Sequence, residues 1–315
     1  MKPRFSFTDA LGAPFVLLRR RPLYLFAWGL MMMALIAVMY SILIPTMASM
    51  IAAGGRQEAF DTYLAESIRM QMALNGLNVV MYLIMLITWT AAGRAILTPS
   101  RGDRFLYLRF GMDEVRVALA VIATFVGWYL GLIVLVLIGF GIGAALWSQG
   151  EATAIPVLVV YGLMVFALSI WGWLRVSLIA PASLVLKRFA FVEGWAIARG
   201  QMWKLFGLNV AIWFIYMISL IIAYAAAGGI LVGAFFGQGL VWPEAIESVV
   251  DLEPLIQPMI LPALATMIPL SFVFGWVMCL YAAPGVVVAR QLLDGAPLPA
   301  ANAQDAPPVD TLQPL

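Results

Sequence analysis

The sequence predicts an all-α integral membrane protein, a polytopic bundle of six transmembrane helices that form three hairpins with amphipathic segments at one membrane face. The first observation is composition: 64% of the residues are hydrophobic and 11% are charged, whereas soluble domains carry about 25% charged residues. The second is six apolar runs, each long enough for a hydrocarbon core of about 30 Å, which takes about 20 helical residues. The third is that no run alternates as a membrane strand would, so the runs are predicted to be helices.

The six predicted helices and the tail divide the chain along its length. Residues 1–293 are predicted to form a single membrane domain, and residues 294–315, rich in Pro, Ala and Gln, a disordered cytoplasmic tail. The first run follows a basic stretch but continues to about Ile44, longer than a secretory signal core, so we expect a retained membrane helix. The predicted helices cover residues 22–46, 72–95, 117–146, 155–180, 205–236 and 258–289.

Amphipathic segments precede the membrane helices. Ser6 and Asp9 have the spacing of a capping box, which predicts a helix start. Near the middle of the chain a membrane helix is predicted to end at Arg175; Pro181 follows, and an amphipathic segment is predicted to lie on the surface before Arg199. Two further apolar faces are predicted from helical spacing: Phe7, Leu11, Phe15 and Leu18 before the first run, and Phe105, Leu108, Met112 and Val115 before the third.

The basic residues predict the orientation. All but two of the 18 Lys and Arg residues lie on one side of the predicted helices, the exceptions being Arg56 and Arg69. Basic residues are retained on the cytoplasmic side, so both termini are predicted to be cytoplasmic.

The three hairpins indicate a parallel repeat. Arg19 and Phe26 have the same separation as Arg199 and Phe206, with a Leu before each Phe. The alternative is that basic ends with a nearby Pro are common to any polytopic protein. Small residues also recur at four-residue spacing, which predicts close packing within the bundle or, alternatively, a dimer face. These stripes are Gly127, Gly131, Gly139 and Gly143, and Ala225, Gly229, Gly233 and Gly237.

Composition also excludes much chemistry. The chain has no histidine and one cysteine, Cys279, which removes His-based catalysis, His metal ligands and disulfides within the chain. Sequence motifs of hydrolases, metalloproteases and nucleotide-binding loops are absent. Asp113 and Glu114 are adjacent, so they should point in different directions on a helix and make a poor catalytic pair. The sequence therefore predicts no enzyme activity, no cofactor, no metal and no nucleic-acid partner.

The candidate binding residues are basic and lie among tryptophans. Guanidinium groups bind phosphate in a bidentate manner, and basic pockets between helices hold anionic lipid headgroups. The alternative is an ordinary aromatic belt with basic side chains that extend to the interface. The candidate lipid-phosphate residues are Arg94, Arg175, Arg199 and Lys204, interleaved with Trp171, Trp173, Trp195 and Trp203.

Residues 171–208 resemble a family. The phrases L-R-V-S-L-I-A-P-A and V-E-G-W-A-I-A-R-G-Q-M-W-K-L-F-G are similar to a broad group of bacterial six-helix membrane proteins, themselves similar to the membrane domain attached to some glycerophosphodiester phosphodiesterases. The resemblance implies a membrane module in the bacterial inner membrane. It does not imply phosphodiesterase activity, because that catalytic domain is absent and its chemistry needs histidines. The matching residues are Arg175, Pro181, Glu193, Trp195, Arg199, Gly200, Trp203, Leu205 and Phe206.

These observations favour a non-enzymatic membrane protein, a scaffold or accessory module that binds anionic lipid or a membrane partner, including a homo-oligomer. One alternative is a transporter or channel for a neutral or amphiphilic solute, which a polar cavity at Asn75, Asn78 or Asn209 would favour. Another is a lipid-modifying enzyme, which a pocket that joins Arg175 and Arg199 to Glu193 would favour.

Overall fold

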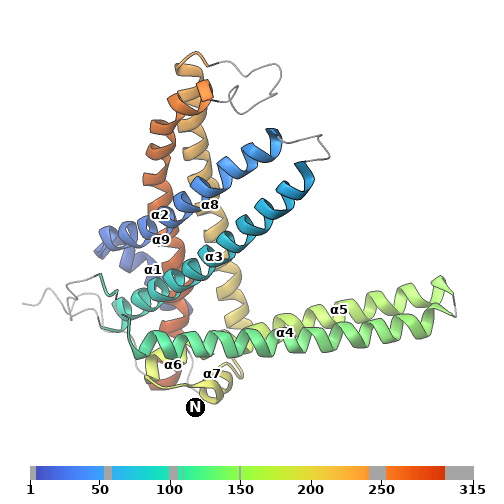
Figure 1. Cartoon of the computed structure of the whole chain (residues 1–315). Coiled ribbons are helices and arrows are strands. Elements are labelled where there is room, and N and C mark those ends of the chain that lie inside the picture. Colours follow the sequence, from blue (N-terminus) through green and yellow to red (C-terminus); the bar gives the residue numbers. More distant parts are fainter. Residues whose placement is uncertain are drawn as a thin grey trace, which may run out of the picture. The chain divides into compact units, whose positions relative to one another are not determined.

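In the computed structural model the described residues are 5–52, 59–98, 106–108, 110–148, 150–240 and 253–294, and within these ranges the regular structure is helical throughout. The fold class predicted from the sequence is therefore confirmed as all-α (Figure 1). The helices are α1 (Phe7–Arg20), α2 (Pro22–Ala52), α3 (Ala59–Leu97), α4 (Met112–Trp147), α5 (Glu151–Val176), α6 (Ile179–Leu186), α7 (Phe191–Ile197), α8 (Met202–Gly237) and α9 (Glu253–Asp294).

Six segments in the described part are long and apolar enough to cross a membrane, which confirms a multi-pass membrane protein. Each overlaps one predicted run. The fourth differs most, because it continues past the predicted end at residue 180 and includes both α5 and α6. The six candidate spans are Pro22–Ile44, Ser67–Leu97, Met112–Trp147, Glu151–Leu186, Met202–Gly237 and Gln257–Leu293.

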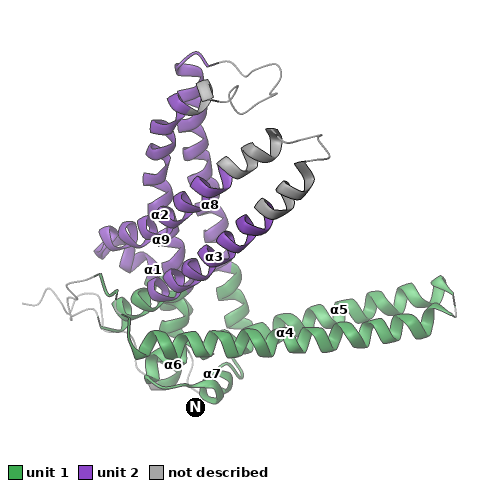
Figure 2. Ribbon diagram, viewed as in Figure 1, with its two compact units in different colours: residues 1–13, 90–210, 282–315 green, residues 14–89, 211–281 purple. Residues whose placement is uncertain are grey.

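The chain divides into two compact units, which are described separately (Figure 2). Unit 1 comprises residues 1–13, 90–210 and 282–315, and unit 2 comprises residues 14–89 and 211–281. The single membrane domain of residues 1–293 stays a prediction. The predicted tail begins at Asp294, the last residue of α9, and otherwise lies outside the described residues.

Unit 2 contains a close crossing of α2 and α9. A Cβ atom on Gly29 would lie 1.5 Å from the carbonyl oxygen of Ser271, and one on Gly275 would lie 1.8 Å from that of Leu25. The two backbones therefore touch, as small residues allow where lipid removes the hydrophobic drive to pack. The indole of Trp276 donates a hydrogen bond to the Ser219 hydroxyl of α8, 3.0 Å away.

The α4–α5 hairpin of unit 1 packs along a narrow seam. Gly139 and Gly143 lie against Tyr161 and Leu158 of α5, as the first small-residue stripe predicts. Gly127, in the same stripe, meets no described neighbour within 4 Å. Most of the large apolar side chains of α4 are exposed, as expected for a helix that faces lipid. The other glycines of the two stripes also have no described neighbour within 4 Å of an added Cβ; these are Gly131 of the first stripe and Gly229, Gly233 and Gly237 of the second.

The segment that follows Arg175 differs from its prediction. Arg175 lies in the last turn of α5 as expected, but Pro181 lies within α6, whose side chains from Pro181 to Leu184 are buried. A buried helix that was not predicted therefore precedes the surface segment. The reason is that α6 is apolar on all sides, so no polar face directs it to water. The exposed amphipathic helix is α7, which begins only at Phe191.

The first amphipathic helix forms as predicted, but with a different buried face. In α1 the buried residues are Ala10, Ala13, Pro14 and Leu17, whereas Phe15 is exposed. Small residues allow closer approach than the predicted Phe and Leu face, so tertiary packing decided the rotation of the helix.

The helix start of α1 is completed by a distant residue. The Ser6 hydroxyl accepts a hydrogen bond from the Asp9 N–H at 3.3 Å, as the capping spacing predicts. The reciprocal bond of a capping box is replaced by Gln291 of α9, whose Oε1 accepts from the Ser6 N–H at 2.8 Å and whose Nε2 donates to the Asp9 carboxylate at 3.3 Å. One amide thus ties the start of α1 to α9 within unit 1.

Candidate functional site

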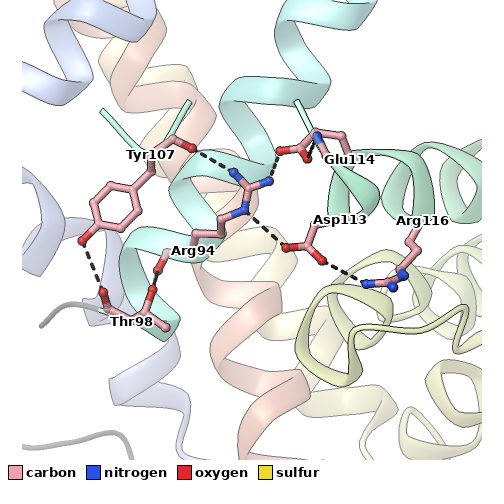
Figure 3. Close-up of polar contacts among 7 residues, drawn as sticks. Arg94, Thr98, Tyr107, Asp113, Glu114 and Arg116 are labelled. Carbon is pink, nitrogen blue, oxygen red and sulfur yellow. Dashed lines mark hydrogen bonds and ion pairs between the residues drawn. The ribbon is translucent and has the colours of Figure 1, made fainter. Parts of the chain in front are cut away.

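Arg94 lies in the last turn of α3 and pairs with two carboxylates at the start of α4 (Figure 3). Its Nη2 donates to Glu114 Oε1, and its Nε lies 3.6 Å from Asp113 Oδ2. The Arg94 side chain is 14% exposed and that of Glu114 is 0% exposed. The last turn of a helix favours a cation and the first turn favours an anion, so the charges also suit both helix dipoles.

Glu114 both pairs with Arg94 and caps α4. Its Oε2 accepts a hydrogen bond from the N–H of Gly111, the N-cap residue, at 2.9 Å. The spacing from Gly111 to Glu114 is that of a capping box without the hydroxyl partner. A buried carboxylate is costly unless it is paired and hydrogen-bonded, and here both oxygens have partners.

Tyr107 is held in an unusual backbone conformation by the same arginine. Leu106 and Tyr107 have φ values of 57° and 58°, in the left-handed region that costs non-glycine residues about 1–2 kcal/mol each. The Tyr107 carbonyl accepts from Arg94 Nη1 at 2.9 Å, and its hydroxyl donates to the Thr98 carbonyl at 3.3 Å (Figure 3). The Tyr107 ring is buried, so the turn is fixed by packing and by hydrogen bonds.

We call Arg94, Tyr107, Gly111, Asp113, Glu114 and Arg116 the Arg94 network. Arg116 binds Asp113 at 3.1 Å and completes it. Although Asp113 and Glu114 are adjacent in sequence, both lie within ion-pair distance of Arg94. Whether they would make a catalytic pair stays a prediction.

The helical face predicted before the third run does not form as one helix, because Leu106 and Tyr107 lie in a turn and α4 begins only at Met112. Met112 and Val115 are exposed, whereas Tyr107, Glu114 and Val117 are buried. Phe105 lies outside the described residues. The buried face includes a carboxylate because Arg94 neutralises it, and periodicity of apolar residues does not detect that.

Arg175 has a different environment. Its guanidinium lies over the rings of Trp171 and Trp195, at 5.2 and 5.4 Å from their centroids. The two indoles meet edge to face at 5.9 Å. Its Nη1 donates to the Trp195 carbonyl at 3.4 Å, and its Nε is buried with no hydrogen-bond partner in the described part of the chain. We call Trp171, Arg175 and Trp195 the Arg175 site.

The other two predicted residues lie at the surface. Arg199 is exposed after α7 and has no ion pair among the described side chains. Lys204, in the first turn of α8, is exposed and reaches the Phe5 carbonyl at 3.5 Å and the Phe5 ring at 5.7 Å. Of the remaining tryptophans, Trp203 is 87% exposed, and Trp173 packs edge to face on Trp128 at 6.1 Å.

The four predicted lipid-phosphate residues thus lie in distinct environments. No hydrogen bond or ion pair joins any two of them within the described ranges. Arg94 is engaged by carboxylates, Arg175 is held by indoles, and Arg199 and Lys204 are exposed. Their role in lipid binding stays a prediction. The sequence signal that was missed is the Gly111–Glu114 spacing at the start of the third span, after a second span whose last turn carries an arginine.

The structure also describes Glu193, the carboxylate that the alternative of a lipid-modifying enzyme would need. Glu193 forms an ion pair with Arg188 at 2.8 Å, and both side chains are substantially exposed. Asn209, from the transport alternative, donates to the Leu205 carbonyl of its own helix at 2.9 Å. No group of three metal-binding side chains occurs in the parts of the chain that the structure describes.

No family model matches the chain, and no curated protein or solved structure is significantly similar to it. The class that the fold defines is a multi-span membrane protein with six long apolar helices.

Proposed function

We propose that the protein is a non-enzymatic accessory module of the bacterial inner membrane, with both termini in the cytoplasm, and that it binds an anionic lipid headgroup at the Arg175 site. The observation that carries this proposal is the guanidinium of Arg175, which is oriented by two indoles and has one buried N–H without an acceptor.

The environment of Arg175 suits a phosphate. A buried N–H without a partner costs about 1–3 kcal/mol, and an anionic oxygen removes that cost. Arginine presents several donors in one plane and binds phosphate in a bidentate manner. The rings of Trp171 and Trp195 lie on adjacent sides of the guanidinium, with centroids 5.9 Å apart, and hold it in place.

The location of Arg175 suits a lipid. It lies in the last turn of α5, the first of the two helices in the candidate span Glu151–Leu186, and headgroups are found where membrane helices end. The same stretch carries the resemblance to the membrane domain attached to some glycerophosphodiester phosphodiesterases. The absence of histidine from the sequence supports a binding role over a catalytic one.

The test is native mass spectrometry of the protein extracted with its surrounding lipid, as detergent is raised. We expect one anionic lipid to remain bound to the wild type and to be lost from Arg175→Ala. Arg175→Lys keeps the charge but loses the planar donors, so its retention should be intermediate.

The matched control is Arg19→Ala, which removes one exposed cation at the end of α1 and leaves the Arg175 site intact. Lipid retention equal in Arg175→Ala and wild type would contradict the proposal. A co-purifying protein without retained lipid would instead favour an assembly module.

A further inference from the structure

In the segment from residue 187 to 204 several large apolar side chains are exposed, and three small residues are buried. In and beside α7, the buried residues are Ala190, Gly194 and Ala198, spaced one turn apart. A Cβ atom on Gly194 would lie 2.5 Å from the Cα of Ile179, so α7 lies directly on the backbone of α6. The side of α7 that packs inward is therefore fixed.

The outward side carries aromatic and aliphatic groups. Val192 is 74% exposed and Trp203 is 87% exposed. Phe189 and Phe191 are also exposed and stack on each other at 6.2 Å between centroids. Large apolar groups that project together from a polar segment are expected to contact another apolar phase.

The charges in the same segment are mostly positive. Lys187, Arg188, Arg199 and Lys204 are four exposed cations, and Glu193 is the single carboxylate. Glu193 pairs with Arg188 at 2.8 Å, so the other three cations have no carboxylate partner in the described part of the chain. The net positive charge is complementary to a surface of anionic lipids.

The position of the segment in the chain determines what it can meet. It follows the candidate span Glu151–Leu186 and precedes the span Met202–Gly237. A short connection between two consecutive spans lies at the end of both, and this is the boundary between lipid and water. Helices with apolar groups on one side and basic groups beside them lie in that boundary plane.

We propose that residues 187–204, which we call the α7 surface, form an interfacial element that inserts Phe189, Phe191 and Val192 into a bilayer leaflet rich in anionic lipid. The surface recruits anionic lipid around this part of the protein through Lys187, Arg199 and Lys204. This element acts on the bilayer surface and does not require a lipid at Arg175.

The chain offers a direct test, because its single cysteine, Cys279, is buried and can be replaced. In a Cys279→Ala background, Val192→Cys is spin-labelled and the full-length protein is reconstituted into phosphatidylcholine vesicles with and without phosphatidylglycerol. We expect the ratio of accessibility to oxygen over accessibility to an aqueous nickel reagent to rise severalfold when phosphatidylglycerol is present. Control labels are Phe140→Cys, 79% exposed within a span, and the exposed Ser148→Cys at the end of α4, for lipid and water respectively.

A second variant tests the charges. Lys187→Gln, Arg199→Gln and Lys204→Gln together should abolish the dependence on phosphatidylglycerol, whereas Arg19→Ala, which removes an exposed cation outside the α7 surface, should leave it unchanged. The proposal is overturned if the Val192 label is as accessible to water as the Ser148 label in both vesicle types. It is also overturned if the label is shielded from both reagents in native membranes but not in vesicles, because a protein partner would then cover the surface.

Discussion

Two arginines of unit 1, one in the last turn of α3 and the other in the last turn of α5, have opposite environments. Arg94 is paired with Glu114 and Asp113, and its donors are taken up within the protein. Arg175 is held by the rings of Trp171 and Trp195 and keeps a buried N–H without an acceptor in the described structure. In the sequence both are basic residues that end an apolar run.

The difference shows that a basic residue at the end of a span can serve either the fold or a ligand. An arginine neutralised by buried carboxylates has a structural role, because its removal leaves a charge without a partner. An arginine oriented by aromatic rings retains its charge and donors for an external anion. The four predictions below test this distinction, from the largest expected effect to the smallest.

The largest effect is expected for Arg94→Ala. It leaves Glu114 fully buried without its partner, so we expect a loss of about 3–5 kcal/mol in the free energy of unfolding. Thermal unfolding in mild detergent measures it. The double variant Arg94→Ala with Glu114→Gln should recover part of the loss, since no buried charge then remains. A loss no larger than that of Arg175→Ala would remove the distinction between the two arginines.

The second effect tests whether the region around Arg175 is held by packing instead of by charges. In Gly194→Ala the new Cβ meets the backbone of Ile179 at 2.5 Å, which cannot move aside as a side chain can. Overpacking of this kind costs about 1–3 kcal/mol. The control is Gly162→Ala in α5, where no described atom lies within 4 Å and alanine should stabilise the helix. Equal stability of the two variants would argue against close packing of α7 on α6.

A smaller effect separates the two carboxylates of the Arg94 network. Asp113 is 29% exposed and lies 3.6 Å from Arg94, so Asp113→Asn should cost no more than about 1 kcal/mol. Glu114→Gln should cost clearly more, because Glu114 is buried and also caps α4. Chemical unfolding of both variants compares them, and similar losses would mean that burial does not set the strength of the pairing.

The smallest effect is expected for Arg188→Ala. The ion pair between Arg188 and Glu193 is exposed, and pairs of this kind contribute about 0–1 kcal/mol. The unfolding temperature should therefore change little, and any difference from wild type should shrink as salt is added. A loss as large as that of Gly194→Ala would show that charges also hold the region around Arg175.

Part of the candidate site could be read from the sequence. Arg175 and its tryptophans were predicted together, because they lie close in the chain around one span end. Glu114 was missed as the partner of Arg94, because twenty residues separate them and a carboxylate in an apolar pattern looks exposed. The role of Gln291 in completing the start of α1 is still less accessible to sequence reasoning, since α9 lies at the other end of the described chain.

The sequence by itself determined the helical fold class, the six spans and the concentration of basic residues at their ends. These follow from local composition, since the length of an apolar run and the bilayer thickness suffice to define a span. The tertiary structure decided which arginine is neutralised, that α6 is buried while α7 is exposed, and which face of α1 packs inward. These depend on contacts between residues distant in sequence, where the fit of small side chains and the pairing of buried charges outweigh helical periodicity.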